Sequence, residues 1–175
     1  MCLHCPNRLE IAANNIETEI FTFDQEQLLQ PAPIEDPFYS AFRGHFTSLL
    51  SWQDLDVFWQ LVRQNTAAGW YVYAIGEAPP AAPATAEQVN TFLSEIDALL
   101  RREHQEDYCG IVYTDSKTAP SMIKIFDPNN LGVQCGFSDN PPLPGWVMSR
   151  LPPVALYDRA HRPEGRKRWW RRLWD

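Results

Sequence analysis

The stretch Thr85–His104, TAEQVNTFLSEIDALLRREH, contains the clearest structural signal in this chain. Thr85 followed by Gln88 three residues later matches a capping box, a pattern that predicts where a helix begins. Apolar side chains then recur at intervals of three and four residues, as on one buried helix face: Val89, Phe92, Leu93, Ile96, Leu99 and Leu100. The spacing predicts a long amphipathic helix that ends at about His104.

Predicted strands lie on both sides of this helix. Upstream, Trp70–Ile75 is an apolar, β-rich run, and a Pro/Ala-rich linker at residues 76–84 separates it from the helix. Downstream, Tyr108–Thr114 and Ser121–Phe126 are spaced as the two strands of a hairpin. Gly145–Leu151 is predicted as a last short strand.

Two more helices are predicted before Trp70. The first prediction rests on a helical block of side chains at three- and four-residue steps: Phe38, Ala41, Phe42, His45, Phe46 and Leu49. The second helix begins after Ser51, which forms a variant capping box with Asp54, and ends near Gly69. Ile16–Phe23 resembles an edge strand with imperfect alternation. This order predicts an α+β (mixed α/β) fold, with helices on one small, mostly antiparallel sheet of three to five strands.

The bulk properties indicate one globular domain. The chain has 175 residues, of which 45% are hydrophobic and 13% aromatic, so it can bury a real core. We expect a single domain over residues 1–156 and a tail over residues 157–175. No apolar run approaches the ~20 residues that span a bilayer, and the N-terminus shows no signal-peptide pattern. With four cysteines and no export signal, a cytoplasmic location is expected.

The charge is divided unevenly between body and tail. From Arg159 to Asp175 there are seven Lys/Arg and two acidic residues, a net charge of +5, whereas the preceding residues have a net charge of −12. The last ten residues, Arg166–Asp175, read RKRWWRRLWD. On a helix at about 100° per residue, one arc of about 140° contains Trp169, Trp170, Leu173 and Trp174. The cationic side chains cover the rest, and Arg166 alone intrudes on the apolar side.

Four interpretations fit such a tail. Trp and Arg are the residue types enriched at protein interfaces, which predicts an acidic protein partner bound through Arg168, Trp169, Trp170, Arg171, Arg172, Leu173 and Trp174. The tail also fits nucleic acid, with arginines on phosphates and indoles on bases. It fits an anionic membrane surface as well. Finally, it can pack on the chain's own acidic body. We expect a small cytoplasmic accessory or adaptor protein that docks on a protein partner.

Four cysteines suggest a second hypothesis. Cys2 and Cys5 form a CxxC pair, and Cys109 and Cys135 could complete a four-thiolate site for zinc or an iron–sulfur cluster. Cys109 and Cys135 do not form a second CxxC, so the spacing matches standard zinc sites poorly. The alternative is a metal- or cluster-binding maturation factor or enzyme. The competing interpretation is ordinary buried or terminal thiols and no cofactor.

Evidence for catalysis is thin. Asp107, Asp115 and Asp127 flank predicted strand ends, where catalytic carboxylates are found, but aspartates also form turns at such places. His45 and His104 have no obvious second ligand or partner carboxylate. No phosphate-binding loop, dinucleotide fingerprint or nucleophile elbow is present. The sequence therefore favours a protein without catalytic activity.

Overall fold

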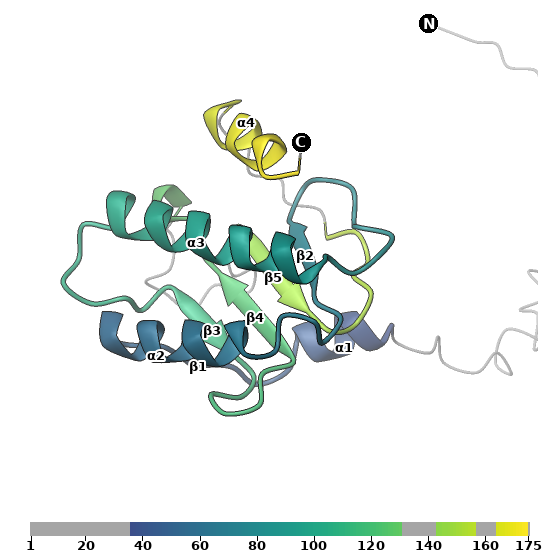
Figure 1. The fold of residues 1–175 in the computed structure, drawn as a ribbon, viewed down its shortest axis with the longest axis horizontal. Coiled ribbons are helices and arrows are strands. Elements are labelled where there is room, and N and C mark those ends of the chain that lie inside the picture. The colour runs from purple at the N-terminus through teal and green to yellow at the C-terminus, as the bar shows by residue number, and fades with distance from the viewer. Residues whose placement is uncertain (1–35, 131–142, 157–163, 175) are drawn as a thin grey trace, which may run out of the picture. The chain divides into compact units, whose positions relative to one another are not determined.

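The computed structural model describes residues 36–130, 143–156 and 164–174. Every described residue belongs to one compact unit within residues 35–175. Within it the helices are α1 (Pro37–Phe42), α2 (Trp52–Arg63), α3 (Ala86–Glu103) and α4 (Glu164–Arg172). The strands are β1 (Thr47–Ser48), β2 (Tyr71–Ala74), β3 (Val112–Thr114), β4 (Met122–Ile125) and β5 (Trp146–Ser149). A 3₁₀ turn, η2, covers Pro128–Asn130 (Figure 1).

The described strands form one antiparallel sheet in the order β1-β3-β4-β5-β2. β3 and β4 pair as the predicted hairpin, with Val112 opposite Ile125. β5 lies between β4 and β2, and pairs Met148 with both Ile123 and Val72. The predicted α+β class, with helices on one small antiparallel sheet, is therefore confirmed. β1 and β2 are the two edges of this sheet.

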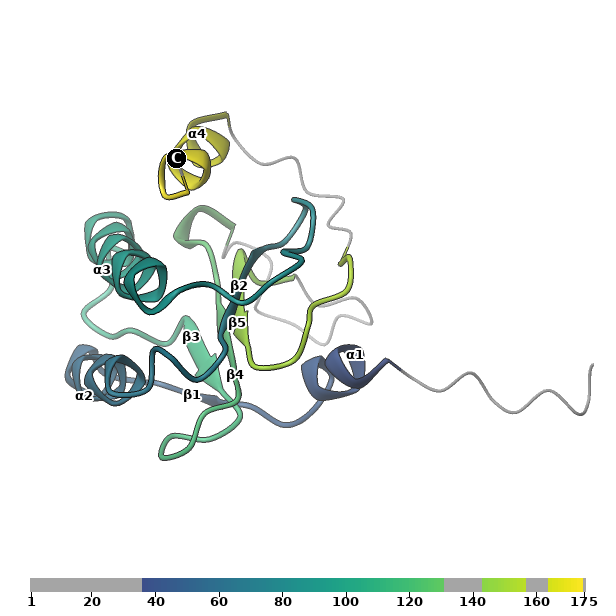
Figure 2. The same cartoon turned by 45° about the vertical axis from the view of Figure 1, so that its right-hand side comes forward.

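Helices cover both faces of the sheet. Figure 2 shows α2 and α3 on one face and α1 on the other. Because side chains alternate along a strand, Val72 and Ala74 of β2 enter the larger core under α2 and α3, whereas Tyr73 enters the smaller core under α1. The larger core also contains the six apolar α3 residues predicted from the spacing, each fully buried.

The predicted capping boxes begin the two long helices. The Thr85 hydroxyl accepts a hydrogen bond from the Gln88 amide, and the Gln88 side chain accepts one from the Thr85 amide. Ser51 and Asp54 make the same reciprocal pair at the start of α2. α3 ends where expected, with His104 as its C-cap. Local sequence thus sets where these helices begin, and their buried faces fix them on the sheet.

The predicted helical block from Phe38 to Leu49 is wrong beyond Phe42. α1 stops at Phe42, whose carbonyl accepts a hydrogen bond of 2.6 Å from the Lys124 ammonium. The chain then turns at Gly44 and enters β1, which pairs with β3. Phe42 and Phe46 still share an environment, because both rings lie against Lys124, with their centroids 4.2 and 3.8 Å from its nitrogen. The helical spacing of Phe42 and Phe46 therefore reflects their shared contact with Lys124 and not one continuous helix.

Other predicted elements have mixed outcomes. The strands expected in Trp70–Ile75, Tyr108–Thr114, Ser121–Phe126 and Gly145–Leu151 are confirmed as β2, β3, β4 and β5, each two to four residues shorter in all than predicted. The expected edge strand Ile16–Phe23 lies outside the described residues. Within the part of the chain that is described, no helix has the length and apolar character needed to cross a bilayer.

Candidate functional site

The C-terminal helix α4 packs its aromatic face on the body. Trp169, Trp170, Leu173 and Trp174 are half-buried against the larger core. The ring of Trp169 meets Trp146 edge-on at 5.4 Å between centroids, and Trp170 meets Phe92 of α3 at 6.2 Å. Such edge-to-face pairs add to the free energy gained from burying the rings. A nine-residue helix is marginal alone, so these contacts account for its order.

Arg166 anchors α4 to two acidic residues of the body. Its guanidinium donates two parallel bonds of 2.7 Å to the Asp127 carboxylate and one of 2.6 Å to Glu103 Oε2. It also lies over the ring of Trp146, 5.5 Å from the centroid. Only 7% of the Arg166 side chain is exposed. Paired, bidentate geometry is what allows such a charge to be buried. We call Arg166, Glu103 and Asp127 the arginine anchor.

The ionisation of Glu103 reflects this anchor. Burial acts to raise the pKa of Glu103, but hydrogen bonds from Arg166 and Arg102 outweigh it and hold the pKa below its usual value. For Arg166, burial acts to lower the pKa, while the bonds to Asp127 and Glu103 raise it overall. Both groups are therefore charged at neutral pH, and each stabilises the charge of the other.

The opposite face of α4 is an exposed row of arginines. Arg168, Arg171 and Arg172, which we call the arginine ridge, are all exposed. Arg172 approaches Glu95 of α3 at 3.7 Å, with 72% and 45% of the two side chains exposed, a geometry that contributes little to stability. Among the described residues, no carboxylate pairs with Arg168 or Arg171. The ridge is therefore available to another molecule.

These contacts bear on the residues predicted for partner binding. The aromatic half of the predicted set, Trp169, Trp170, Leu173 and Trp174, lies on the chain's own core, as the self-packing interpretation expects. The basic half remains on the surface. Partner binding through Arg168, Arg171 and Arg172 stays a prediction, and the structure separates the two halves by face.

The predicted metal site is mostly outside the described residues. Cys2, Cys5 and Cys135 are not described, and Cys109 is fully buried as a free thiol. Burial raises the pKa of the Cys109 thiol, which disfavours the thiolate that a metal requires. Within the described ranges, no group of three or more His, Cys, Asp or Glu side chains is placed to hold a metal ion. The four-cysteine site stays a prediction.

The predicted carboxylates and histidines do not converge. Asp115 caps the β3–β4 hairpin, accepting hydrogen bonds from the Ser121 hydroxyl and amide and from the Met122 amide. Asp107 is exposed, and Asp127 belongs to the arginine anchor. His104 lies between the rings of Trp52 and Tyr108, and His45 is exposed. Turn formation and packing account for Asp115 and His104.

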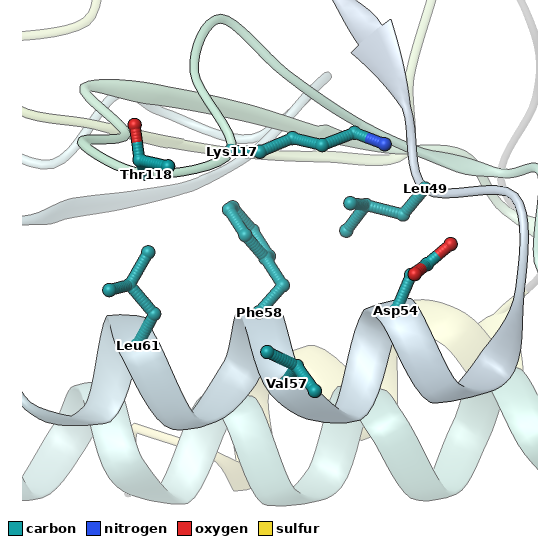
Figure 3. Close-up of a pocket in the computed structure, with 7 residues that line it drawn as sticks. All are labelled: Leu49, Asp54, Val57, Phe58, Leu61, Lys117 and Thr118. Carbon is teal, nitrogen blue, oxygen red and sulfur yellow. The ribbon is translucent and has the colours of Figure 1, made fainter.

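Described residues line at least two surface clefts. One, of about 350 Å³, lies between α2 and the β3–β4 loop. Figure 3 shows Phe58 and Leu61 pointing from α2 toward Lys117 and Thr118 of that loop. A second, of about 390 Å³, lies between the 76–84 loop, α3 and α4. Its lining includes Trp170 and Trp174, so it adjoins the candidate site.

Sequence reasoning missed the partners of Arg166. Its position on the apolar side of the helical projection was a visible signal, because a buried arginine requires carboxylates. Glu103 and Asp127 lie 63 and 39 residues away, so only the tertiary structure identifies them. Lys124 was missed as well, and no local pattern marks it.

Comparison of the chain with models of known protein families, with curated proteins and with solved structures finds no match.

Proposed function

We propose that this protein is a cytoplasmic adaptor without catalytic activity, and that its arginine ridge docks on an acidic surface of a protein partner. The observation behind this proposal is the division of α4 into two faces. Its indoles and Arg166 are engaged by the body, whereas Arg168 and Arg171 are exposed and unpaired among the described residues. Guanidinium groups three and four residues apart on one helix suit a row of carboxylates.

The direction of the indoles supports a protein partner over the two alternatives. Stacking on unpaired bases and insertion between lipid headgroups both need exposed aromatic rings. Here Trp169, Trp170 and Trp174 are half-buried on the chain's own core.

The test places a photo-crosslinking residue at position 168 and, as a control, at position 43, in cells that produce the protein. We expect one main cross-linked protein from position 168 and none of it from position 43. The double variant Arg168→Gln/Arg171→Gln should weaken binding of that purified protein at least tenfold. Arg43→Gln/Arg150→Gln removes the same charge from exposed sites elsewhere and should change it less than twofold.

Two competing ligands complete the test. A single-stranded 20-nucleotide DNA and vesicles containing phosphatidylserine are titrated against the same variants. Both should bind more weakly than the cross-linked protein at physiological salt. Tighter binding of either one that depends on Arg168 and Arg171 would overturn the proposal, as would equal losses in the ridge and control variants.

A further inference from the structure

The edge strand β2 has backbone groups that its neighbours leave unpaired. The Ile75 amide donates to the Gly145 carbonyl, so residues 75, 73 and 71 direct their backbone groups toward β5. By alternation, residues 70, 72 and 74 direct theirs to the outer edge. There the Trp70 carbonyl accepts from Ala84 at 2.7 Å and the Ala74 carbonyl from Glu77 at 3.0 Å. Val72 lies between these two residues, and no described residue pairs with its backbone N–H or C=O at the outer edge.

The composition of the covering loop explains this gap. The loop at residues 76–84 folds back along the outer edge of β2, but three of its residues are prolines, at 79, 80 and 83. Proline has no N–H to donate, so much of this loop cannot extend the ladder. The loop therefore caps the edge at two points and leaves a donor and an acceptor of Val72 between them. Buried backbone groups of this kind are normally paired, and Val72 is only 4% exposed.

The cleft of about 390 Å³ borders this gap. Its lining includes Val72 from the strand, Pro80, Ala82 and Pro83 from the loop, and Trp170 and Trp174 from α4. The indole N–H of Trp174 is buried and also lacks a partner among the described residues. The volume of the cleft falls at the low end of the roughly 300–1,000 Å³ typical of small-ligand sites. This size suits one or two residues of a peptide. We call this the β2 edge cleft.

The chemistry of these walls specifies an extended peptide. A residue in β conformation offers one C=O and one N–H on the same side, which match the N–H and C=O of Val72. Aromatic and proline surfaces favour a small apolar or proline side chain next to it. Arg171 follows Trp170 on α4 and lies about 60° from Trp174 around the helix axis. An acidic residue next to the bound residue of the peptide would therefore lie close to the Arg171 guanidinium.

We propose that the β2 edge cleft binds one residue of an extended, acidic, proline-containing segment of the partner, which pairs with the Val72 backbone while its flanking carboxylates meet Arg171. This inference rests on the proposed function and names the kind of segment that the adaptor recognises. The charge of the ridge selects acidic segments, and the cleft selects an extended one with a small central residue.

The test uses the peptide acetyl-Glu-Glu-Val-Pro-Glu-Glu-amide and the full-length protein labelled with nitrogen-15. We expect the Val72 amide and Trp174 indole signals to shift on titration, and the Val72 amide to exchange more slowly. Ala82→Phe, which fills the cleft from an exposed loop position, should weaken binding at least tenfold. Ala81→Phe adds the same bulk next to it, outside the lining, and should change binding less than twofold.

Further outcomes separate this inference from the proposed function. Peptide binding that depends on Arg168 and Arg171 but leaves the Val72 amide unchanged would overturn the cleft assignment and leave the ridge proposal intact. Binding that Ala82→Phe removes and Arg168→Gln/Arg171→Gln does not affect would support the pairing with Val72 but overturn both the contact with Arg171 and the ridge proposal. Self-association that Ala82→Phe abolishes would assign the cleft to a second copy of this chain and overturn the peptide proposal.

Discussion

One cationic side chain anchors each of two helices, α1 and α4, but the two cations meet different partners. Lys124 on β4 reaches the end of α1, where it contacts the ring and the carbonyl of Phe42, and it also contacts the ring of Phe46 in the following loop. Arg166 on α4 reaches the body, where it meets the carboxylates of Glu103 and Asp127.

The difference shows that the partners of a buried cation decide whether its charge stabilises the protein. Removing a cation from water is costly, and only opposite charges or several strong hydrogen bonds compensate. Arg166 has two carboxylates and remains charged. Lys124 has neutral partners, and burial lowers its pKa to about 8. The anchor of α4 therefore depends on charge, whereas α1 is held by packing around a cation whose charge is a cost.

The largest effect is expected from removing the cation of α4. Arg166→Met leaves Asp127 without a counterion among the described residues and Glu103 with only the exposed Arg102, which should weaken the docking of α4 by about 3–5 kcal/mol. Hydrogen exchange of the α4 amides and the emission of its tryptophans measure this loss. Arg102→Met is the matched control, because Arg102 also pairs with Glu103 but is 63% exposed. Full protection of α4 in the Arg166 variant would contradict the anchor.

Acid should weaken the same contact. Because the pKa of Glu103 is lower in the folded state than in the unfolded chain, its contribution is present above the unfolded value and lost as pH falls through the folded one. Charge-assisted bonds of this kind contribute about 1.5–3 kcal/mol. Protection of the α4 amides should therefore fall between pH 6 and pH 3. Glu103→Gln should show a smaller fall, and an unchanged acid response in that variant would exclude Glu103 as its source.

Base should stabilise the α1 side. Between pH 8 and about 10.4, the unfolded chain keeps a proton on Lys124 that the folded protein has released, so stability rises with pH in this window. After solvent screening the rise should be about 1–2 kcal/mol. Urea unfolding at pH 7.5 and pH 10 measures it. The difference should shrink in Lys124→Met and persist in Lys117→Met, since Lys117 is exposed.

The smallest effect on stability belongs to the outer face of α4. Arg168→Gln/Arg171→Gln should change the free energy of unfolding by less than about 0.5 kcal/mol, because both side chains are exposed and unpaired among the described residues. Thermal melting checks this directly. A loss as large as that of Arg166→Met would mean that the ridge stabilises the fold, and would remove the reason for assigning it to a partner.

Much of the fold follows from local patterns. The capping boxes at Thr85 and Ser51 and the apolar, β-rich run Trp70–Ile75 are encoded within a few residues, so they could be predicted. β1 could not, because a two-residue strand has no period of its own and is defined only by pairing with β3. The helical spacing through Phe46 predicts a helix at this place instead of a strand. That spacing arises because Phe42 and Phe46, which belong to different elements, both contact Lys124.

The candidate site was predictable in part. Helical projection of the sequence alone separates the indoles from the cations on α4 and places Arg166 on the apolar side. What receives that face depends on residues distant in sequence, such as Phe92, Trp146 and Asp127. The β2 edge cleft was not predictable, because it arises where the loop, α3 and α4 meet.

The proline-bearing loop over β2 also has a consequence for solubility. An open, apolar edge strand such as Trp70–Ile75 invites identical chains to add strand by strand into aggregates. Here the loop occupies both ends of the edge and leaves a gap of one residue, too short to template a ladder. Shortening the loop would therefore be expected to expose the edge and turn a selective contact point into a site of uncontrolled polymerisation.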